Sequence, residues 1–456
     1  MLEDTIIAIS TPPGTGGLGI IRLSGPDALA VAGQIFQAKN IDGRDFPVRK
    51  LVLGELVDRQ SGGVLDECFL VSFESPNSYT REDMIELTCH GSPVLLEEIV
   101  RLGIRAGARP AGPGEFTLRA YLNGRLDIIQ AEAVNDLIRS VTLTQAKASV
   151  RQILGGVSSK LGSIREELIR LAADIESGLE FPEEGLGLEA NEQLQALEKI
   201  LSGVNKLIAS YEAGRALGEG LTVAIIGRKN VGKSTIFNAL LEHERAIVTP
   251  FPGTTRDFIK EHLIINGYVF HLIDMAGLGE PGDPAERIGI KKSWGIAEEA
   301  EGLILVMDIS TGLSKDDEML IEKFRQRKPI VVLNKIDLPG KIDRDMIKGM
   351  VPGGRVVEIS ALLGTNIDHL KSNMFEAFGP RQDLEDDVIL HAHQRNKLIE
   401  IKDALEKACL ILTSGHSEEM GAEEIRGALK IMGELTGEIS TEDVINDIFS
   451  RFCVGK

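Results

Sequence analysis

The chain has 456 residues, too many for one hydrophobic core, so several domains are expected. Its composition, 43% hydrophobic and 26% charged, is that of a globular protein and excludes disordered and fibrous classes. The net charge of −19 argues against a protein that coats nucleic acid with its whole surface, because phosphates are neutralised by Lys and Arg.

No stretch approaches the about 18 uncharged apolar residues that a membrane span needs. The first residues, MLEDTIIAIS, carry acids where a secretory signal has Lys or Arg. We therefore expect a cytoplasmic protein with no membrane partner. The cysteines, Cys68, Cys89, Cys409 and Cys453, lie far apart without CxxC spacing, which indicates neither a disulfide framework nor a zinc site.

Residues 1–118 alternate short apolar runs, such as GIIRLSG and MIELTCHG, with Gly/Pro-rich segments, which predicts an α+β domain. Three later segments carry apolar residues at alternating spacings of three and four, the pattern of an amphipathic helix. These stripes run from Leu154 to Ile175, from Leu194 to Tyr211 and from Leu398 to Leu412. We expect them to form one discontinuous helical bundle from residues 119–216 and 380–456, because closely placed ends allow a domain to be inserted.

The inserted segment, residues 217–379, alternates strand and helix patterns. Its runs LTVAIIG, VFHLID, LILVMD, IVVLNK and VVEIS are short, apolar and end in polar residues. Such an alternation predicts a largely parallel α/β sheet with its binding site at the carboxyl ends of the strands.

The sequence GRKNVGKS, residues 227–234, follows a predicted strand and opens a predicted helix, which is the context that a P-loop requires. On its own it also fits a Gly-rich turn. As a P-loop, its backbone N–H groups and Lys233 would hold phosphates and Ser234 would hold Mg²⁺. The expected nucleotide contacts in this segment are Asn230, Val231, Gly232, Lys233, Ser234 and Thr235.

Further motifs follow in the order that a GTPase needs. Thr254 and Thr255 stand in a loop that can cap the metal, with Thr255 as a second Mg²⁺ ligand, while Asp274 and Gly277 belong to an Asp-x-x-Gly motif beside the metal and the γ-phosphate. The base would be read by Asn334, Lys335, Asp337, Ser360 and Ala361. Asp337 can accept both hydrogen bonds from the guanine N–H edge, which adenine does not offer, so GTP is the expected nucleotide.

The residue after this Asp-x-x-Gly motif is Leu278, where many GTPases have a glutamine that orients the attacking water. A leucine side chain cannot orient water. Catalysis then draws on another group, and the acids Glu280, Asp283 and Glu286 are the candidates, although each also fits an ordinary surface carboxylate.

Several segments together carry a family resemblance: TPPGTGGLGIIRLSG, GPGEFTLRAYLNGRLD, FPEE, the GTPase motifs, DPAERIGI and the terminal FCVGK. Over essentially its whole length the chain resembles the tRNA wobble-uridine modification GTPases, the MnmE or TrmE family. The resemblance implies an N-terminal tetrahydrofolate-binding-like domain. It also implies a partner protein that carries FAD, and the addition of an aminomethyl-type group to carbon 5 of a wobble uridine in tRNA, with a 5-formyl- or methylene-type folate as one-carbon source.

The resemblance also implies roles for individual residues. Arg22, Glu86, Arg125 and Lys456 would bind folate, and Glu286 would position the attacking water. The GTPase would be stimulated by K⁺ and would act as a homodimer whose GTPase domains meet; the K⁺ ligands would be Asn230, Thr249, Phe251 and Thr254, with Thr249 also beside the nucleotide. The chain departs from the family pattern at Thr15, Lys229, Met275 and Gly279.

The last residues allow two interpretations. Cys453 is either a reactive thiol beside the folate site, hence a catalytic candidate, or part of a passive tail. A prenylation signal is rejected, because Gly455 is not aliphatic and Lys456 is an atypical last residue. Ser440 with an acid three residues later is a helix-start signal, which predicts a short helix over 441–450 that releases the tail.

Two other functions remain possible from the sequence. A ribosome-assembly or RNA-binding switch GTPase would need an RNA-binding module beside the GTPase domain, yet residues 380–456 have more acids than bases and lack a GxxG clamp. A scaffold GTPase would have no chemistry outside residues 217–379, and folate binding by the rest of the chain would exclude it.

Overall fold

The computed structural model describes residues 4–39, 46–180, 190–242, 260–274, 295, 297–380, 387–414, 418–439, 445 and 448–456. The chain forms two compact units, one of residues 1–138, 149–204 and 399–456 and the other of residues 139–148 and 205–398. In the described ranges, every helix is too short or too polar to cross a membrane. The division into domains at residues 118, 216 and 379 stays a prediction.

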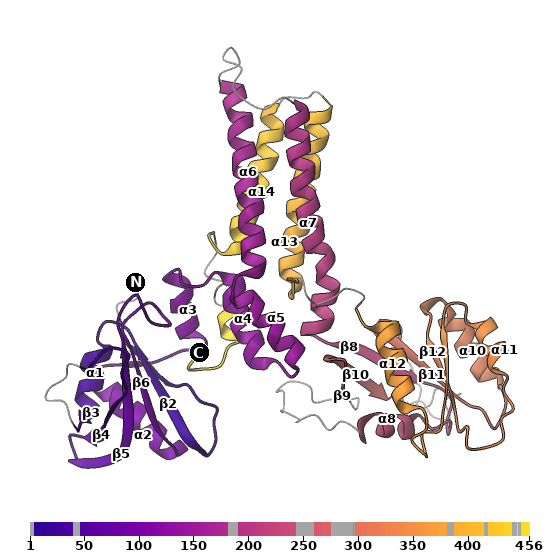
Figure 1. Ribbon diagram of the computed structural model, residues 1–456, viewed down its shortest axis with the longest axis horizontal. Coiled ribbons are helices and arrows are strands. Elements are labelled where there is room, and N and C mark those ends of the chain that lie inside the picture. Colours follow the sequence, from indigo (N-terminus) through magenta and orange to yellow (C-terminus); the bar gives the residue numbers. More distant parts are fainter. Residues whose placement is uncertain are drawn as a thin grey trace, which may run out of the picture. The chain divides into compact units, whose positions relative to one another are not determined.

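The N-terminal part of the first unit is a sheet built from the apolar runs noted in the sequence (Figure 1). Its described strands are β1 (Ile6–Ile9), β2 (Gly16–Ser24), β3 (Phe36–Ala38), β4 (Val52–Asp58), β5 (Gly63–Phe73), β6 (Met84–Gly91) and β7 (Arg109–Pro110). They lie in the order β3-β4-β5-β6-β2-β1-β7. Neighbours run antiparallel, except for the parallel pair β1 and β7.

One face of this sheet packs against α1 (Ala28–Ile35) and α2 (Pro93–Arg105). Ile21 and Leu23 of β2 belong to this core, as do Ile85 and Leu87 of β6. Because side chains alternate along a strand, the residues between them, at positions 22 and 86, project from the other face of the sheet.

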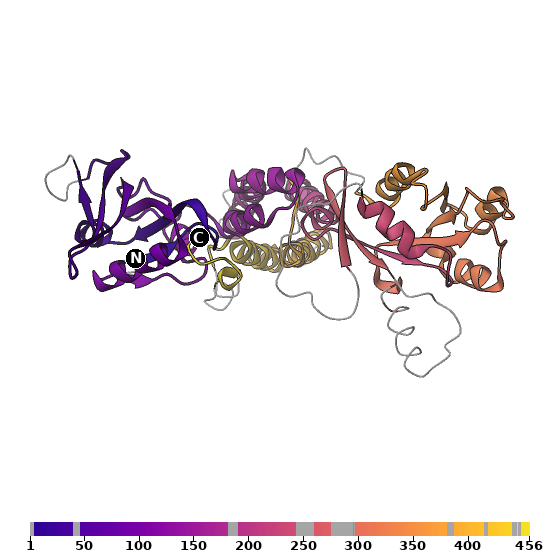
Figure 2. The ribbon, with the colours of Figure 1, turned by 90° about the horizontal axis from the view of Figure 1, so that it is seen from below.

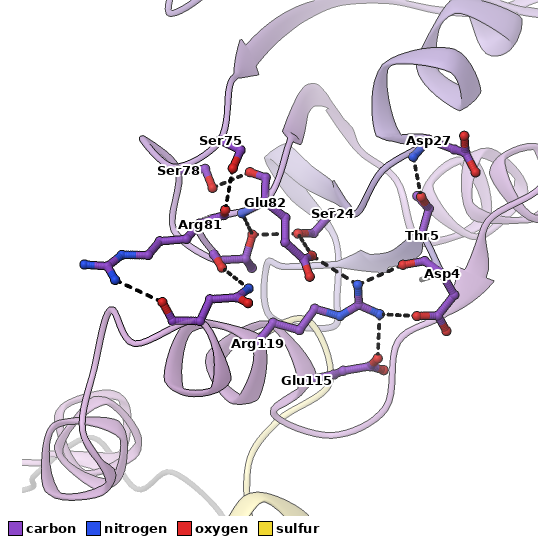
Figure 3. Close-up of polar contacts among 12 residues, drawn as sticks. Asp4, Thr5, Ser24, Asp27, Ser75, Ser78, Arg81, Glu82, Glu115 and Arg119 are labelled. Carbon is purple, nitrogen blue, oxygen red and sulfur yellow. Dashed lines mark hydrogen bonds and ion pairs between the residues drawn. The ribbon is translucent and has the colours of Figure 1, made fainter. Parts of the chain in front are cut away.

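A buried arginine ties α3 (Glu115–Leu122) to the rest of this domain (Figure 3). The side chain of Arg119 is 0% exposed; it donates to Asp4 Oδ1 at 2.8 Å, Glu82 Oε2 at 3.1 Å and Glu115 Oε1 at 3.0 Å. Burial opposes the ionisation of Glu115, but hydrogen bonds from Arg109, the Gly112 N–H and Arg119 outweigh it and lower the pKa of Glu115. Since an unpaired buried charge is costly, this network fixes the 75–83 loop, which carries Glu82, against α3.

The helical part consists of α4 (Ile128–Arg139), α5 (Leu143–Ile153), α6 (Gly156–Glu180), α7 (Ala190–Gly218), α13 (Ala392–Thr413) and α14 (Glu418–Thr436). In the first unit α6 packs against α14, and Lys199 of α7 pairs with Glu167 of α6 at 2.6 Å. Figure 2 shows the long helices nearly end-on. Segments from both sides of the inserted sheet therefore share one bundle, as predicted.

The apolar stripes form the buried faces of these helices with small differences. Val157, Leu161 and Leu168 of α6 are 0% exposed, whereas Leu154 precedes the helix and is 79% exposed. On α7, Ile200 and Leu207 are buried, while the predicted Leu201 and Ile208 are half-buried. At two positions on α7, the residue that is buried is therefore the one before the residue predicted.

The second unit contains the predicted P-loop sheet. Its described strands are β8 (Leu221–Ile226), β9 (Lys260–Ile265), β10 (Tyr268–Asp274), β11 (Gly302–Asp308), β12 (Ile330–Asn334) and β13 (Arg355–Ile359). Their order is β13-β12-β11-β8-β10-β9. All neighbouring pairs are parallel except β9 with β10, an antiparallel hairpin that the sequence pattern did not predict.

Helices cover both faces of this sheet, because its strands are apolar on both sides. Val223 and Ile225 of β8 share a core with α8 (Lys233–Glu242) and α12 (Ile367–Phe378). Ala224 and Ile226 point the other way, toward α10 (Lys315–Phe324) and α11 (Arg344–Met350). A short 3₁₀ turn, η1 (Arg325–Arg327), follows α10. The predicted fold class is confirmed: an α+β domain, a discontinuous helical bundle and an inserted α/β P-loop domain.

Candidate functional site

The loop between β8 and α8 has the backbone of a phosphate-binding turn. Asn230 and Gly232 have φ angles of 67° and 96°, in the left-handed region. A Cβ atom on Gly232 would lie 2.3 Å from Asn334 Nδ2, so this position requires glycine. The turn leads directly into α8, whose first N–H groups and positive dipole end favour an anion.

Lys233 lies inside this loop. Its side chain is buried, and Nζ donates to the carbonyl oxygens of Gly227 at 3.0 Å and Arg228 at 2.9 Å. Burial lowers the pKa of Lys233, and the negative charge of Asp274 opposes that shift. The loop therefore holds a cationic group at its centre, where it can meet phosphate oxygens.

Ser234 and Asp274 come together at the ends of two neighbouring elements. Ser234 is the second residue of α8 and Asp274 is the last residue of β10; Ser234 Oγ donates to Asp274 Oδ2 at 2.8 Å. A hydroxyl and a carboxylate are the hard oxygen donors that Mg²⁺ prefers, so these two residues fit a magnesium ion. Thr235 follows on the same turn of α8 and is exposed.

Asn334 joins the phosphate side of the site to the base side. This residue ends β12 and is 3% exposed. Its Nδ2 donates to the carbonyl oxygen of Val231 at 2.9 Å, and its Oδ1 accepts from the N–H of Ala361 at 3.0 Å. Three separate predicted motifs therefore contact one another through a single buried amide.

Lys335 is oriented by a residue that the sequence analysis did not single out. Its Nζ donates to Asp308 Oδ2 at 2.6 Å and to the carbonyl oxygen of Asn230 at 2.9 Å. Burial raises the pKa of Asp308, but hydrogen bonds from Lys335 and Ser310 outweigh burial, so the net pKa lies below its ordinary value. The signal was present in the sequence, since Asp308 ends the run LILVMD at the carboxyl edge of the sheet.

Asp337 and Ser360 lie together on the base side. Ser360 Oγ donates to Asp337 Oδ1 at 2.5 Å and accepts from the N–H of Leu363 at 3.3 Å. Ser360 is buried, whereas Asp337 is exposed. The hydroxyl thus holds an accessible carboxylate in a fixed orientation, as recognition of a base edge requires.

Several predicted residues lie outside the described ranges, and their positions stay predictions. They are the loop residues Thr249, Phe251, Thr254 and Thr255, together with Gly277 and the candidate acids Glu280, Asp283 and Glu286. Most of the predicted helix over 441–450 also lies outside them; its described residues, 445 and 448–450, are helical.

A second cluster of predicted residues lies on the N-terminal sheet. Arg22 and Glu86 are cross-strand partners on β2 and β6, on the face away from α1 and α2. Arg22 Nε donates to Glu86 Oε1 at 2.7 Å, and both side chains are about one-fifth exposed, at 19% and 21%. An accessible guanidinium is therefore held in place by a carboxylate.

The ring of Tyr79 brings Arg125 to the same face of the sheet as Arg22. Tyr79 was not among the residues predicted from the sequence. The guanidinium carbon of Arg125 lies 4.5 Å from the centre of the Tyr79 ring, and that of Arg22 lies 5.8 Å from it. Arg125 Nη1 also donates to the carbonyl oxygen of Tyr79 at 2.7 Å. The only signal in the sequence was an aromatic residue in a polar loop, which has many ordinary explanations.

The C-terminal tail packs onto the N-terminal domain. The N–H of Gly114 donates to the carbonyl oxygen of Cys453 at 3.1 Å, and Val454 forms a β-bridge with Pro113. Burial lowers the pKa of Lys456 and the positive charge of Arg22 adds to this effect, while Glu86 and Cys453 oppose it. Gly455 packs against the Ile9 carbonyl on β1, and the following residue, Lys456, lies within electrostatic range of Arg22 and Glu86. Cys453 is exposed.

Two family models match the chain and together cover nearly all of it. The model described as the MnmE helical domain matches residues 128–453, and the model described as the N-terminus of the GTP-binding protein TrmE matches residues 5–125. The first match alone spans more than half of the chain and includes the inserted P-loop domain.

Relatives of known name match over the full length. The tRNA modification GTPase MnmE of Thermoanaerobacter sp. is 41% identical over 460 residues, covering 100% of both chains. That of Natranaerobius thermophilus is 40% identical over 459 residues, again covering 100% of both. A solved structure of Aquifex aeolicus Era bound to GDP·AlF₄⁻ is 30% identical, with a TM-score of 0.30, over 40% of this chain and 66% of that chain.

Proposed function

Because this chain belongs to the family of the tRNA modification GTPase MnmE, we propose that its GTPase cycle serves the addition of an aminomethyl-type group to carbon 5 of a wobble uridine. The chain is a GTP-hydrolysing enzyme of tRNA modification. A folate supplies the one-carbon unit, and a partner protein supplies FAD. Both the protein and its tRNA substrate are cytoplasmic in this proposal.

The observation that carries the proposal is the cluster of Arg22, Arg125, Tyr79 and Glu86, with Lys456 within electrostatic range of Arg22 and Glu86. A GTPase that acts only as a switch needs no such site outside its nucleotide domain. The cluster has excess positive charge, an aromatic ring and one carboxylate. These groups suit a flat, anionic ligand whose ring has polar edges, which is the chemistry of a folate.

The proposed roles in the nucleotide site also follow from the chemistry of the residues that lie together there. The P-loop residues from Asn230 to Thr235 would contact phosphates, Lys233 would neutralise their charge, and Ser234 would hold Mg²⁺ together with Thr255. The ion, when bound, stabilises the negative charge that develops on the phosphates. The fit of Ser234 and Asp274 to an oxygen-preferring ion supports this assignment.

Base recognition would rest on Asp337. Replacing Asp337 with asparagine is expected to exchange guanine preference for xanthine preference, because an amide can donate to the xanthine edge where the carboxylate could only accept. Ser360, which holds Asp337 at 2.5 Å, keeps a hydrogen-bond partner in this variant. Competition binding of GTP against XTP measures the effect, and unchanged GTP preference would contradict the assignment.

We also propose that K⁺ stimulates hydrolysis and that the GTPase domains of two copies meet. Asn230, Thr249, Phe251 and Thr254 would bind K⁺, which takes the place of an arginine finger, a group worth about 10³–10⁵ in rate. Hydrolysis is expected to be faster in KCl than in NaCl at equal ionic strength, and Asn230→Ala should remove the difference. Steady-state phosphate release at matched salt provides the measurement, and equal wild-type rates in both salts would exclude this role.

The folate assignment has its own experiment. The full chain is titrated with 5-formyltetrahydrofolate by calorimetry, alongside the variants Arg22→Ala and Arg59→Ala. Arg59 is the matched control, because its guanidinium bonds to the Gly33 carbonyl away from the cluster. Binding by the wild type and the control but not by Arg22→Ala is the expected result. Absence of binding by the wild type would overturn the proposed function.

A further inference from the structure

Two arginines from separate elements meet at the ring of Tyr79. Arg22 belongs to β2, while Arg125 follows the turn that ends α3. Their guanidinium carbons lie 5.8 and 4.5 Å from the ring centre, within the range of a cation–π contact. The negative face of an aromatic ring attracts cations, so Tyr79 can hold two groups that repel each other.

The ring is itself fixed by the loop that carries it. The Tyr79 hydroxyl hydrogen-bonds with Thr117 Oγ1 at 2.9 Å, and the Tyr79 carbonyl accepts from Arg125. The neighbouring Thr80 carbonyl accepts from Asn123 Nδ2 at 2.7 Å. The two main-chain contacts tie this loop to the turn after α3, so the ring stays in place when the hydroxyl contact is removed.

The positive charges around the ring repel one another, so their spacing depends on a rigid framework. Arg22 and Arg125 bring two positive charges to the ring of Tyr79, and Glu86 forms an ion pair with Arg22. Like charges held close together repel, and only a rigid framework keeps them at a fixed spacing. An anionic ligand would relieve this repulsion, so the cluster gains most from binding when its cations are already in position.

We propose that Tyr79 is a positioning residue of this site: its ring holds Arg22 and Arg125 at the spacing at which both reach one flat, anionic ligand. The inference rests on the proposed function, because the ligand class is that of the folate site. It adds a residue whose contribution comes from the ring, through the two arginines, and does not depend on the hydroxyl group.

The test separates the ring from the hydroxyl by titrating full-length variants with 5-formyltetrahydrofolate. Tyr79→Phe and Thr117→Val both remove the hydrogen bond between these side chains but keep an aromatic ring, and both should bind like the wild type. Tyr79→Leu removes the ring and should weaken binding by about tenfold or more. Tyr79→Met serves as a second variant without a ring, and unchanged GTP hydrolysis and melting temperature verify that each protein is folded.

A double-mutant cycle distinguishes positioning from a general structural role. Because the ring acts through both arginines, Tyr79→Leu should cost less affinity in an Arg125→Gln background than in the wild-type chain, the remaining loss coming from Arg22. Additive losses would overturn the inference, as would wild-type affinity in Tyr79→Leu or an equal loss in Tyr79→Phe. If the wild type fails to bind the folate, the proposed function fails and this inference fails with it. A different outcome, in which the wild type binds the folate and Tyr79→Leu binds it equally well, would overturn this inference alone.

Discussion

Replacing Cys453 with serine is expected to abolish tRNA modification while GTP hydrolysis and folate affinity stay at wild-type levels. The thiolate is a strong nucleophile, whereas a serine hydroxyl of nearly the same size is not one without an activating base. We propose that this thiol acts on the uridine ring or on the one-carbon unit. Nucleoside profiles from cells that express only the variant measure the effect.

The structure explains why this substitution should remove the thiol without displacing the tail. The tail is held by main-chain contacts, since the Cys453 carbonyl accepts from Gly114 and Gly455 packs against the Ile9 carbonyl. Serine keeps these contacts, so the tail should stay in place. Cys409→Ser, in α13, is the matched control and should leave modification unchanged. A normal nucleoside profile in Cys453→Ser would reduce Cys453 to a passive part of the tail.

Replacing Glu286 with alanine is expected to lower kcat for GTP hydrolysis by about 10²–10⁴, the range for loss of a positioned acid–base group. Nucleotide affinity should change little, because the proposed role of this carboxylate is to orient the attacking water. Leu278 cannot perform that task, although it follows the Asp-x-x-Gly motif directly. Single-turnover hydrolysis and titration with a nonhydrolysable GTP analogue separate the two effects.

Glu280→Ala removes the same charge from the same segment and is the matched control for Glu286→Ala. It should hydrolyse GTP at nearly the wild-type rate. A loss of nucleotide binding in Glu286→Ala would indicate a structural role. Slow GTP hydrolysis by Glu280→Ala together with a wild-type rate in Glu286→Ala would assign the orientation of the attacking water to Glu280.

The parts of the fold that could be predicted are those in which the local pattern and the tertiary environment agree. Strands such as β11 and β12 are apolar on both faces and end in polar residues, Asp308 and Asn334, so the sequence alone predicts a parallel sheet and its functional edge. The hairpin partner β9 was missed, because its run KEHLII mixes charged and apolar residues without a clear period. On α7, apolar residues are dense enough to support two adjacent stripes, and only packing selects Ile200 and Leu207.

The two candidate sites also differ in how far they could be predicted from the sequence. The candidate residues of the P-loop domain stand in fixed spacings that reflect one chemistry, so their pattern along the chain is enough to predict them. Tyr79 contacts residues from elements far apart in the chain, and no spacing encodes those contacts. Asp308 differs, because it ends an apolar run at the carboxyl edge of the sheet and could have been singled out there. Arg22 and Glu86 were named only through the family resemblance, although their cross-strand pairing explains why they lie together.

We propose that this GTPase modifies carbon 5 of a wobble uridine through a second, folate-binding site. The most direct measurement is a tRNA nucleoside profile, by mass spectrometry, from a strain that lacks the gene and carries either the wild-type chain or Arg22→Ala. The wild type should restore the carbon-5 modification, and Arg22→Ala should leave unmodified uridine while still hydrolysing GTP. A profile that is already normal in the deletion strain, or that Arg22→Ala restores in full, would contradict it.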